Sequence, residues 1–146
     1  MTTLRAFHHS LPMMLLRARE MVMHEFRPHL RRHNITEQQW RVLRALHSDG
    51  AMSASTLSSS TLISLPSLTR IIRSLSDRVL LTKRMSSDDQ RSIIIELTNV
   101  GRNMIALASP EAEAIYRRIT DRFGDEQLDT LYELLHQLEH SLQKPK

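Results

Sequence analysis

Apolar residues recur along most of the chain at the three- and four-residue spacing of an amphipathic helix. The spacing is clearest in residues 65–75, LPSLTRIIRSL, where one stripe consists of Leu68, Ile71, Ile72 and Leu75. The opposite face of the same helix carries Ser67, Thr69, Arg70, Arg73 and Ser74. A core needs the apolar stripe, but packing does not require hydroxyl and guanidinium groups on the other face. We therefore predict a helix here with a separate use for its polar face.

The same spacing predicts further helices on both sides of this segment. They cover residues 10–33, 36–50, a short stretch from about 53, 98–123, and the region from 125 onward. Two prolines, Pro28 and Pro110, fall inside the longest of these segments. A proline lacks the backbone N–H and clashes with the preceding turn, so we expect each to kink, end or split its helix.

The helix at 36–50 has a strong start signal. Thr36 and Gln39 have the spacing of a capping box, and Ile35 and Trp40 have that of a hydrophobic staple. We therefore interpret Trp40 as a core anchor rather than as an exposed stacking surface.

The period changes after Leu80, where LTKRM and SIIIEL flank the polar sequence SSDDQR. This pattern predicts a β-hairpin with a polar tip. Three helices followed by a two-stranded wing are the parts of a winged helix-turn-helix, and residues 65–75 occupy the recognition position. We predict a mainly α fold with a small β-hairpin: one domain over 1–146, with a winged helix-turn-helix at 35–97 and dimerisation helices at 1–34 and 98–146.

Composition narrows the class of protein. The chain has no Cys and 3 Gly, and no GxGxxG or P-loop motif occurs in it. Paired carboxylates and a nucleophile–base set are also missing, so we expect no enzyme and no cofactor. The apolar run at 11–16 is too short to span a bilayer, and we expect a cytoplasmic protein.

Charge is distributed unevenly around the net value of +4. Residues 1–47 hold eight Arg against three Glu, whereas residues 96–146 hold six Lys and Arg against nine Asp and Glu. A basic leading part predicts a polyanionic partner for that region alone, such as double-stranded DNA.

The segment PSLTRIIRSL…LLTKRMSSDDQRSIIIELTNVG resembles the MarR family of transcription regulators. The likeness includes an Asp-x-Arg wing at 89–91 and a Leu-Thr-x-x-Gly motif at 97–101. The first third of the chain, LLRARE…FRPHLRRHNITEQQWRVLRAL, is similar to family members that regulate homoprotocatechuate and related aromatic-acid catabolism. The resemblance implies a homodimeric repressor that binds a pseudo-palindromic operator and is released by a small aromatic carboxylate.

One departure from the family concerns the end of the recognition helix. Val79 stands where the family usually has glycine, and valine takes a left-handed cap only at a cost. We therefore expect this helix to end differently and to aim the wing off its usual direction.

The candidate DNA contacts lie on the recognition helix and the wing. They are Ser64, Ser67, Thr69, Arg70, Arg73, Lys83, Arg84, Asp89 and Arg91. Arginine can donate bidentately to guanine, and hydroxyls reach bases or phosphates. The resemblance implies that Arg91 reaches the minor groove or the phosphates, with Asp89 orienting it. The alternatives are a solvated helix face and an Asp–Arg pair that only holds the hairpin.

Arg17 is the candidate ligand-binding residue. The aromatic-acid resemblance makes it suited to gripping a carboxylate with its fork of donors. The alternative is an exposed arginine in an arginine-rich helix.

Two histidine pairs have the i, i+4 spacing that places both rings on one helix face: His29 with His33, and His136 with His140. This spacing keeps a metal-responsive regulator open as an alternative function. No acidic or sulfur ligand completes either pair at clear spacing, so we predict no metal site. The other alternative is a winged-helix module that binds protein and not DNA.

The leucine stripe of the last helix has two interpretations as well. It can belong to the core of one chain, or it can pair with the same helices of a second chain to form a homodimer.

Overall fold

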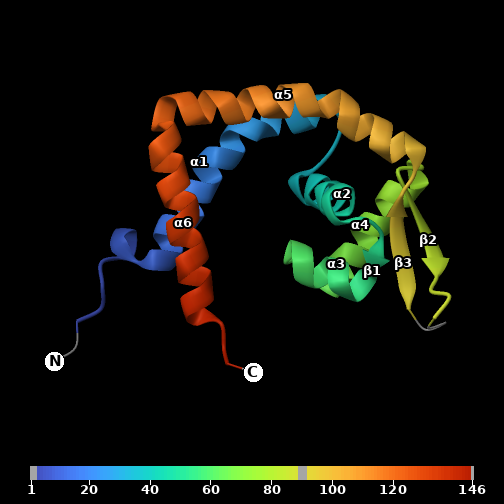
Figure 1. Cartoon of the computed structure of the whole chain (residues 1–146), viewed down its shortest axis with the longest axis horizontal. Helices are drawn as coiled ribbons and strands as arrows, with labels where there is room; N and C mark the ends of the chain where they lie inside the picture. The colour runs from blue at the N-terminus through green and yellow to red at the C-terminus, as the bar shows by residue number, and fades with distance from the viewer. Residues whose placement is uncertain (1–2, 89–91, 146) are drawn as a thin grey trace.

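The computed structural model describes residues 3–88 and 92–145. Its elements are η1 (Phe7–His9), α1 (Leu11–Arg32), α2 (Glu37–Asp49), β1 (Met52–Ser53), α3 (Ala54–Thr61), α4 (Leu65–Asp77), β2 (Leu81–Met85), β3 (Ile93–Leu97), α5 (Asn99–Phe123) and α6 (Asp125–Leu142). In Figure 1, α5 crosses the top of the molecule, from the compact α2–β3 part at one end to α6 at the other.

The α2–β3 part is a winged helix-turn-helix, hereafter the winged module. Its described strands form an antiparallel sheet in the order β1-β3-β2. The hairpin register pairs Leu81 with Leu97 and Met85 with Ile93. The sequence predicted this hairpin but missed β1, whose two residues pair with Ile94 and Ile95. Two residues are too few to give a period, so the third strand forms through tertiary pairing alone.

The hydrophobic core lies inside the winged module and under the first turns of α5. Its buried members are Ile35, Val42, Leu43, Leu46, Leu57, Ile63, Leu68, Ile71, Ile72, Leu75, Leu80, Leu81, Ile95, Leu97 and Ile105. The apolar stripe predicted on α4 is therefore buried as expected. Trp40 packs against this cluster, and the capping box between Thr36 and Gln39 is present, so both predictions are confirmed.

Both long helices continue through their prolines. Pro28 lies inside α1, which runs on to Arg32, and Pro110 lies inside α5, which is one continuous helix that bends along its length (Figure 1). The expected early end of α1 and split of α5 are wrong. Helices α1 and α5 contact each other, and the residues near the two prolines include buried side chains such as Leu30 in α1 and Ala108 in α5. This burial offsets the roughly 3 kcal/mol cost of a proline in a helix interior.

Val79 takes the left-handed conformation that the sequence argued against. Its φ is 60°, its N–H donates to the carbonyl of Ser76, and the N–H of Leu80 donates to the carbonyl of Leu75. These two bonds form a Schellman cap, which the buried Leu75 and Leu80 complete. The expectation that this helix would end differently is wrong.

The cap also connects α4 to the start of α5. Thr98 donates through its hydroxyl to the carbonyl of Val79 and through its N–H to the carbonyl of Leu80. A Cβ placed on Gly101 would lie 2.3 Å from that Leu80 carbonyl oxygen. Glycine is therefore required at the end of the Leu-Thr-x-x-Gly motif because two backbones approach closely there.

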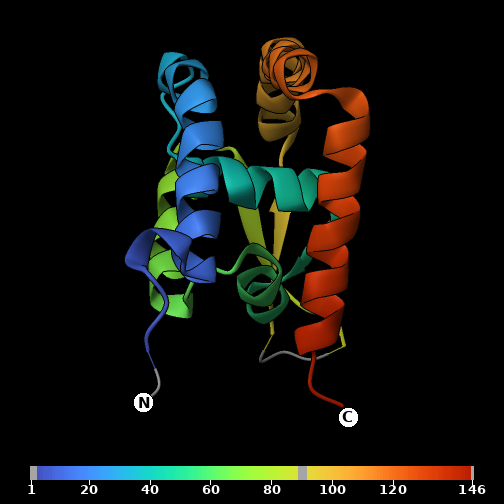
Figure 2. The ribbon, with the colours of Figure 1, turned by 90° about the vertical axis from the view of Figure 1, so that its left-hand side faces the viewer.

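Outside the winged module, the helices leave large apolar side chains exposed. In the described chain α6 buries no residue fully, and the N-terminal half of α1 is exposed apart from the half-buried Met13. Figure 2 shows α1 and α6 on opposite sides of the molecule, and α6 packs on α5. No helix among the described residues is long and apolar enough to cross a membrane.

Candidate nucleic-acid interface and helix junction

The recognition helix α4 presents its polar face to solvent. Ser64 caps it by accepting from the N–H of Ser67, and a proline occupies its first turn at no cost. Thr69, Arg70 and Arg73 are exposed, and Ser67 is half-buried. The helix N-terminus adds a partial positive charge to this face. The predicted residues of α4 and its N-cap are therefore all at least partly accessible to solvent.

Some of the polar side chains of α4 already form hydrogen bonds within the helix. The hydroxyl of Thr69 donates to the carbonyl of Leu65 at 2.9 Å, and Arg70 Nη2 donates to the hydroxyl of Ser67 at 3.4 Å. Both bonds lie on the exposed surface, so solvent or a ligand can replace them at little cost. Arg70 also lines a shallow groove between α2 and α4, next to Gln39, whose amide donates to Ser74 at 3.2 Å.

The wing places Lys83 and Arg84 on opposite faces of β2, because successive side chains alternate across a strand. Arg84 is a diagonal cross-strand neighbour of Glu96, with 3.5 Å between Nε and Oε2. Both partners are largely exposed, so this pair contributes only about 0–1 kcal/mol to stability. Asp89 and Arg91 lie outside the described residues, and their predicted roles stay predictions.

Arg17 lies in the exposed half of α1, with Nη2 3.1 Å from Nδ1 of His8. It lines none of the described pockets of the single chain. The predicted role of Arg17 in ligand binding therefore stays a prediction.

A network of ion pairs that the sequence did not predict joins α1 to the start of α2. Arg27 pairs with both Glu37 and Glu20, and Arg19 lies 3.4 Å from Glu37. The hydrogen bond from Arg27 holds the pKa of Glu37 below its ordinary value. Glu37 is 10 residues from Arg27 and 18 residues from Arg19 and belongs to another helix, so helical spacing alone could not reveal these pairs.

A second polar group lies in the helix junction, the region where α1, α2 and α5 meet around the buried His29. His29 Nδ1 is 2.8 Å from Glu111 Oε2, and the rings of His33 and Trp40 lie edge-on to it. Burial, followed by the charge of Arg32, lowers the pKa of His29.

Glu111 overturns one step of the sequence argument. We expected no acidic side chain to complete the His29–His33 pair, yet Glu111 lies beside both. It is 82 residues from His29 and belongs to another helix, so only the packing of α5 on α1 brings it there.

Arg78 links the helix junction to the recognition helix. It is the C-cap residue of α4, and its guanidinium donates to the carbonyls of Asn34 at 2.7 Å and His33 at 3.4 Å. The turn between α1 and α2 is therefore fastened to the end of α4.

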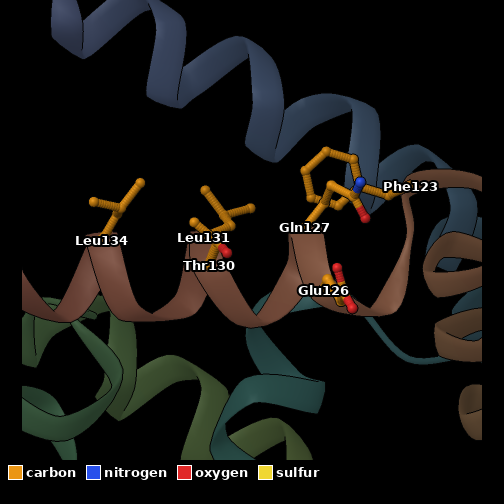
Figure 3. Close-up of a pocket in the computed structure, with 6 residues that line it drawn as sticks. All are labelled: Phe123, Glu126, Gln127, Thr130, Leu131 and Leu134. Atoms are coloured by element: carbon orange, nitrogen blue, oxygen red, sulfur yellow. The ribbon is translucent and has the colours of Figure 1, made fainter.

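An open pocket of about 400 Å³ lies where α5 turns into α6 (Figure 3). Phe123, Leu131 and Leu134 line it together with three polar residues. Figure 3 shows Leu131 and Leu134 projecting from the same side of α6. The pocket is part of the exposed apolar surface described above.

The fold and the exposed arginine and hydroxyl groups of α4 define a winged helix-turn-helix transcriptional regulator. Residues 35–93 match the MarR family. The chain is also 38% identical over 130 residues to the homoprotocatechuate degradative operon repressor of Escherichia coli, which covers 89% of this chain and 88% of that relative. The chain therefore belongs to the MarR family, and the family and fold predicted from the sequence are confirmed.

Two solved structures are similar to this chain over almost their whole length. NadR in complex with 4-hydroxyphenylacetate is 34% identical, with a TM-score of 0.81, covering 94% of this chain and 97% of that one. The transcriptional repressor CouR bound to a 23-mer DNA duplex is 25% identical, with a TM-score of 0.82, covering 94% and 99%.

Proposed function

We propose that this protein is a repressor that binds operator DNA in the cytoplasm as a homodimer and releases it when a small aromatic carboxylate binds. The observation that carries the proposal is α4, whose apolar face is buried in the core while its arginines and hydroxyls face solvent. The E. coli relative is named as the repressor of a homoprotocatechuate degradative operon, and CouR was solved on DNA.

In this arrangement the N-terminal half of α4 enters the major groove. Arg70 and Arg73 read base edges or hold phosphates, with Ser64, Ser67 and Thr69 beside them. A bidentate arginine–guanine contact gives about 1–3 kcal/mol of discrimination. Lys83, Arg84 and the wing tip with Asp89 and Arg91 contact the adjacent minor groove or backbone.

A second copy of the chain accounts for the apolar surface outside the winged module. The exposed large apolar side chains there include Phe7, Leu11, Met14, Leu15, Phe123, Leu131, Tyr132, Leu134 and Leu142. Large exposed apolar surfaces such as those along α1 and along α6 usually mark contact sites for another protein chain. A two-fold dimer through these helices would present its two recognition helices to half-sites about 34–36 Å apart.

The ligand site is completed by that dimer. Arg17 and His8 lie on the surface that the second copy would cover, so the guanidinium becomes enclosed only after dimerisation. A guanidinium fork fits a carboxylate bidentately, and NadR was solved with 4-hydroxyphenylacetate, an aromatic carboxylate. Ligand binding between the chains would change the spacing of the two α4 helices and weaken DNA binding.

Fluorescence anisotropy tests DNA binding first. The DNA between the protein's own gene and its neighbour is compared with scrambled DNA of equal length at two salt concentrations. Binding of the native DNA alone, weakened by salt, supports the proposal. Equal binding to both sequences refutes an operator at this site, and no binding to either contradicts the whole proposal.

The ligand step is tested on the same complex. We expect 4-hydroxyphenylacetate or homoprotocatechuate to release the DNA, whereas 2-(4-hydroxyphenyl)ethanol, which lacks the carboxylate, should not. Arg17→Gln should raise the acid concentration needed for release while leaving DNA affinity without ligand unchanged. Release by the neutral alcohol at the same concentration would contradict carboxylate recognition.

A further inference from the structure

His29 is a buried polar side chain that neither DNA binding nor the helix caps explain. Its side chain is 0% exposed, and its Nε2 has no hydrogen-bond partner among the described residues. Leaving a buried nitrogen without a partner costs free energy, which the rest of the fold has to offset. Its other nitrogen faces Glu111, and His33 lies one helical turn away.

We infer that His29, His33 and Glu111 form a binding site for a divalent transition-metal ion such as Zn²⁺. One ligand atom from each residue lies within 4.8 Å of the other two. Two imidazoles and a carboxylate are a donor set that Zn²⁺ prefers, and three protein ligands leave one tetrahedral position for water or an anion.

One of the three distances between ligand atoms is already short, and the others lie within 4.8 Å. With metal–ligand bonds of about 2.0–2.1 Å, tetrahedral ligand atoms lie about 3.3 Å apart. His29 Nδ1 and Glu111 Oε2 are 2.8 Å apart already. His33 is only partly buried, so rotation of its side chain can close the remaining gap.

The packing of α1 on α5 determines the positions of the three side chains before an ion binds. His29 and His33 are one turn apart on α1, and Glu111 comes from α5. The two helices are held together by buried apolar residues on either side of the cluster: Phe26, Leu30, Ala108, Ala112 and Ile115. Ligands carried on packed helices are placed more accurately than ligands on loops.

Arg32 is the competing charge. Its guanidinium pairs with Oε1 of Glu111, while His29 faces Oε2, so each carboxylate oxygen has one neighbour. The Arg32 side chain is 57% exposed and can turn into solvent. The arginine therefore neutralises Glu111 when no ion is bound and need not block the oxygen that faces His29.

The experiment uses tag-free full-length protein stripped of metal with a chelator. Co²⁺ is titrated in while its visible absorption bands are recorded, and Zn²⁺ is then added in competition. Wild type is compared with His33→Gln and Glu111→Gln. Both positions are partly exposed, and circular dichroism melting checks that each variant folds.

The other histidine pair supplies the control. His136 and His140 share the i, i+4 spacing on α6, are exposed, and are not part of a three-ligand cluster among the described residues. We expect one ion per chain in wild type and in the double variant His136→Gln/His140→Gln. Affinity should fall by at least about 100-fold in His33→Gln and Glu111→Gln, because loss of a direct ligand should cost at least as much as loss of an outer partner.

A second measurement is independent of the cobalt spectrum. An ion that binds only the folded state raises the melting temperature, so Zn²⁺ should stabilise wild type and the α6 double variant but not His33→Gln. The inference is overturned if wild type shows no saturable binding, if His33→Gln binds as wild type does, or if binding disappears in the α6 variant.

Discussion

Replacing Val79 with glycine tests whether the end of the recognition helix is strained. Val79 has φ 60°, a region that L-residues avoid because Cβ crowds the neighbouring carbonyl. The Schellman bonds, the buried Leu75 and Leu80, and the contacts from Thr98 hold it there. The tertiary structure thus imposes a conformation that the side chain opposes.

The magnitude follows from two opposing terms. A left-handed residue with a Cβ costs about 1–2 kcal/mol. Glycine also makes the unfolded chain more flexible, which reduces the gain in stability by about 0.4–1 kcal/mol. The Val79 side chain is 59% exposed, so its removal loses little burial. We expect Val79→Gly to stabilise the protein by about 0.5–1 kcal/mol.

Urea denaturation followed by circular dichroism measures the change at one fixed protein concentration, since oligomerisation would otherwise alter the midpoint. Val79→Ala is the matched control, because it removes the branch but keeps the Cβ that makes the clash. The urea midpoint should rise for Val79→Gly, with an unchanged slope of unfolding free energy against urea concentration. For Val79→Ala the midpoint should stay near that of wild type. Equal gains for the two variants, or a loss for glycine, would refute backbone strain as the cause.

Three further predictions concern DNA, acid stability and assembly. Arg73→Ala should weaken operator binding by about 1–3 kcal/mol in anisotropy if Arg73 reads a base, and should lower the salt slope by about 1 if it holds a phosphate. The depressed pKa of Glu37 stabilises the fold above pH 4.5, its ordinary pKa, and that contribution disappears as pH falls through the lower folded value. Glu37→Gln should therefore lose less stability on acidification than wild type in urea titrations at a series of pH values, and an identical pH profile would contradict this. Leu134 is 55% exposed in the single chain, so Leu134→Glu should keep the helical signal but convert dimer to monomer in light scattering, whereas an unchanged mass would remove α6 from the interface.

The winged module could be predicted because its signals are local. Caps at Thr36 and Ser64 mark helix starts within three residues, and the period change after Leu80 marks the wing. The polar face of α4 is visible in the sequence because core packing accounts for only one side of the helix. Each of these features depends on neighbours within a turn or a strand.

The missed features depend on distant parts of the chain. β1 exists only because β3 pairs with it, and Glu111 reaches His29 only because α5 packs on α1. The left-handed Val79 contradicts its own local preference because the buried Leu75 and Leu80 and the contacts from Thr98 favour the cap. Local propensity is a weak guide wherever tertiary contacts determine the backbone.

Arg78 shows how the helix junction and the DNA-binding surface can influence each other. Its backbone caps α4, and its guanidinium holds the carbonyls of His33 and Asn34 in the turn after α1. A shift of the end of α1 relative to α5 therefore has a direct mechanical connection to the C-terminal end of α4. Gln39 provides a second connection, because it caps α2 and donates to Ser74 on α4. Any ligand that binds one arrangement of this junction more tightly than another must, by linkage, change the affinity for DNA if the two arrangements orient α4 differently.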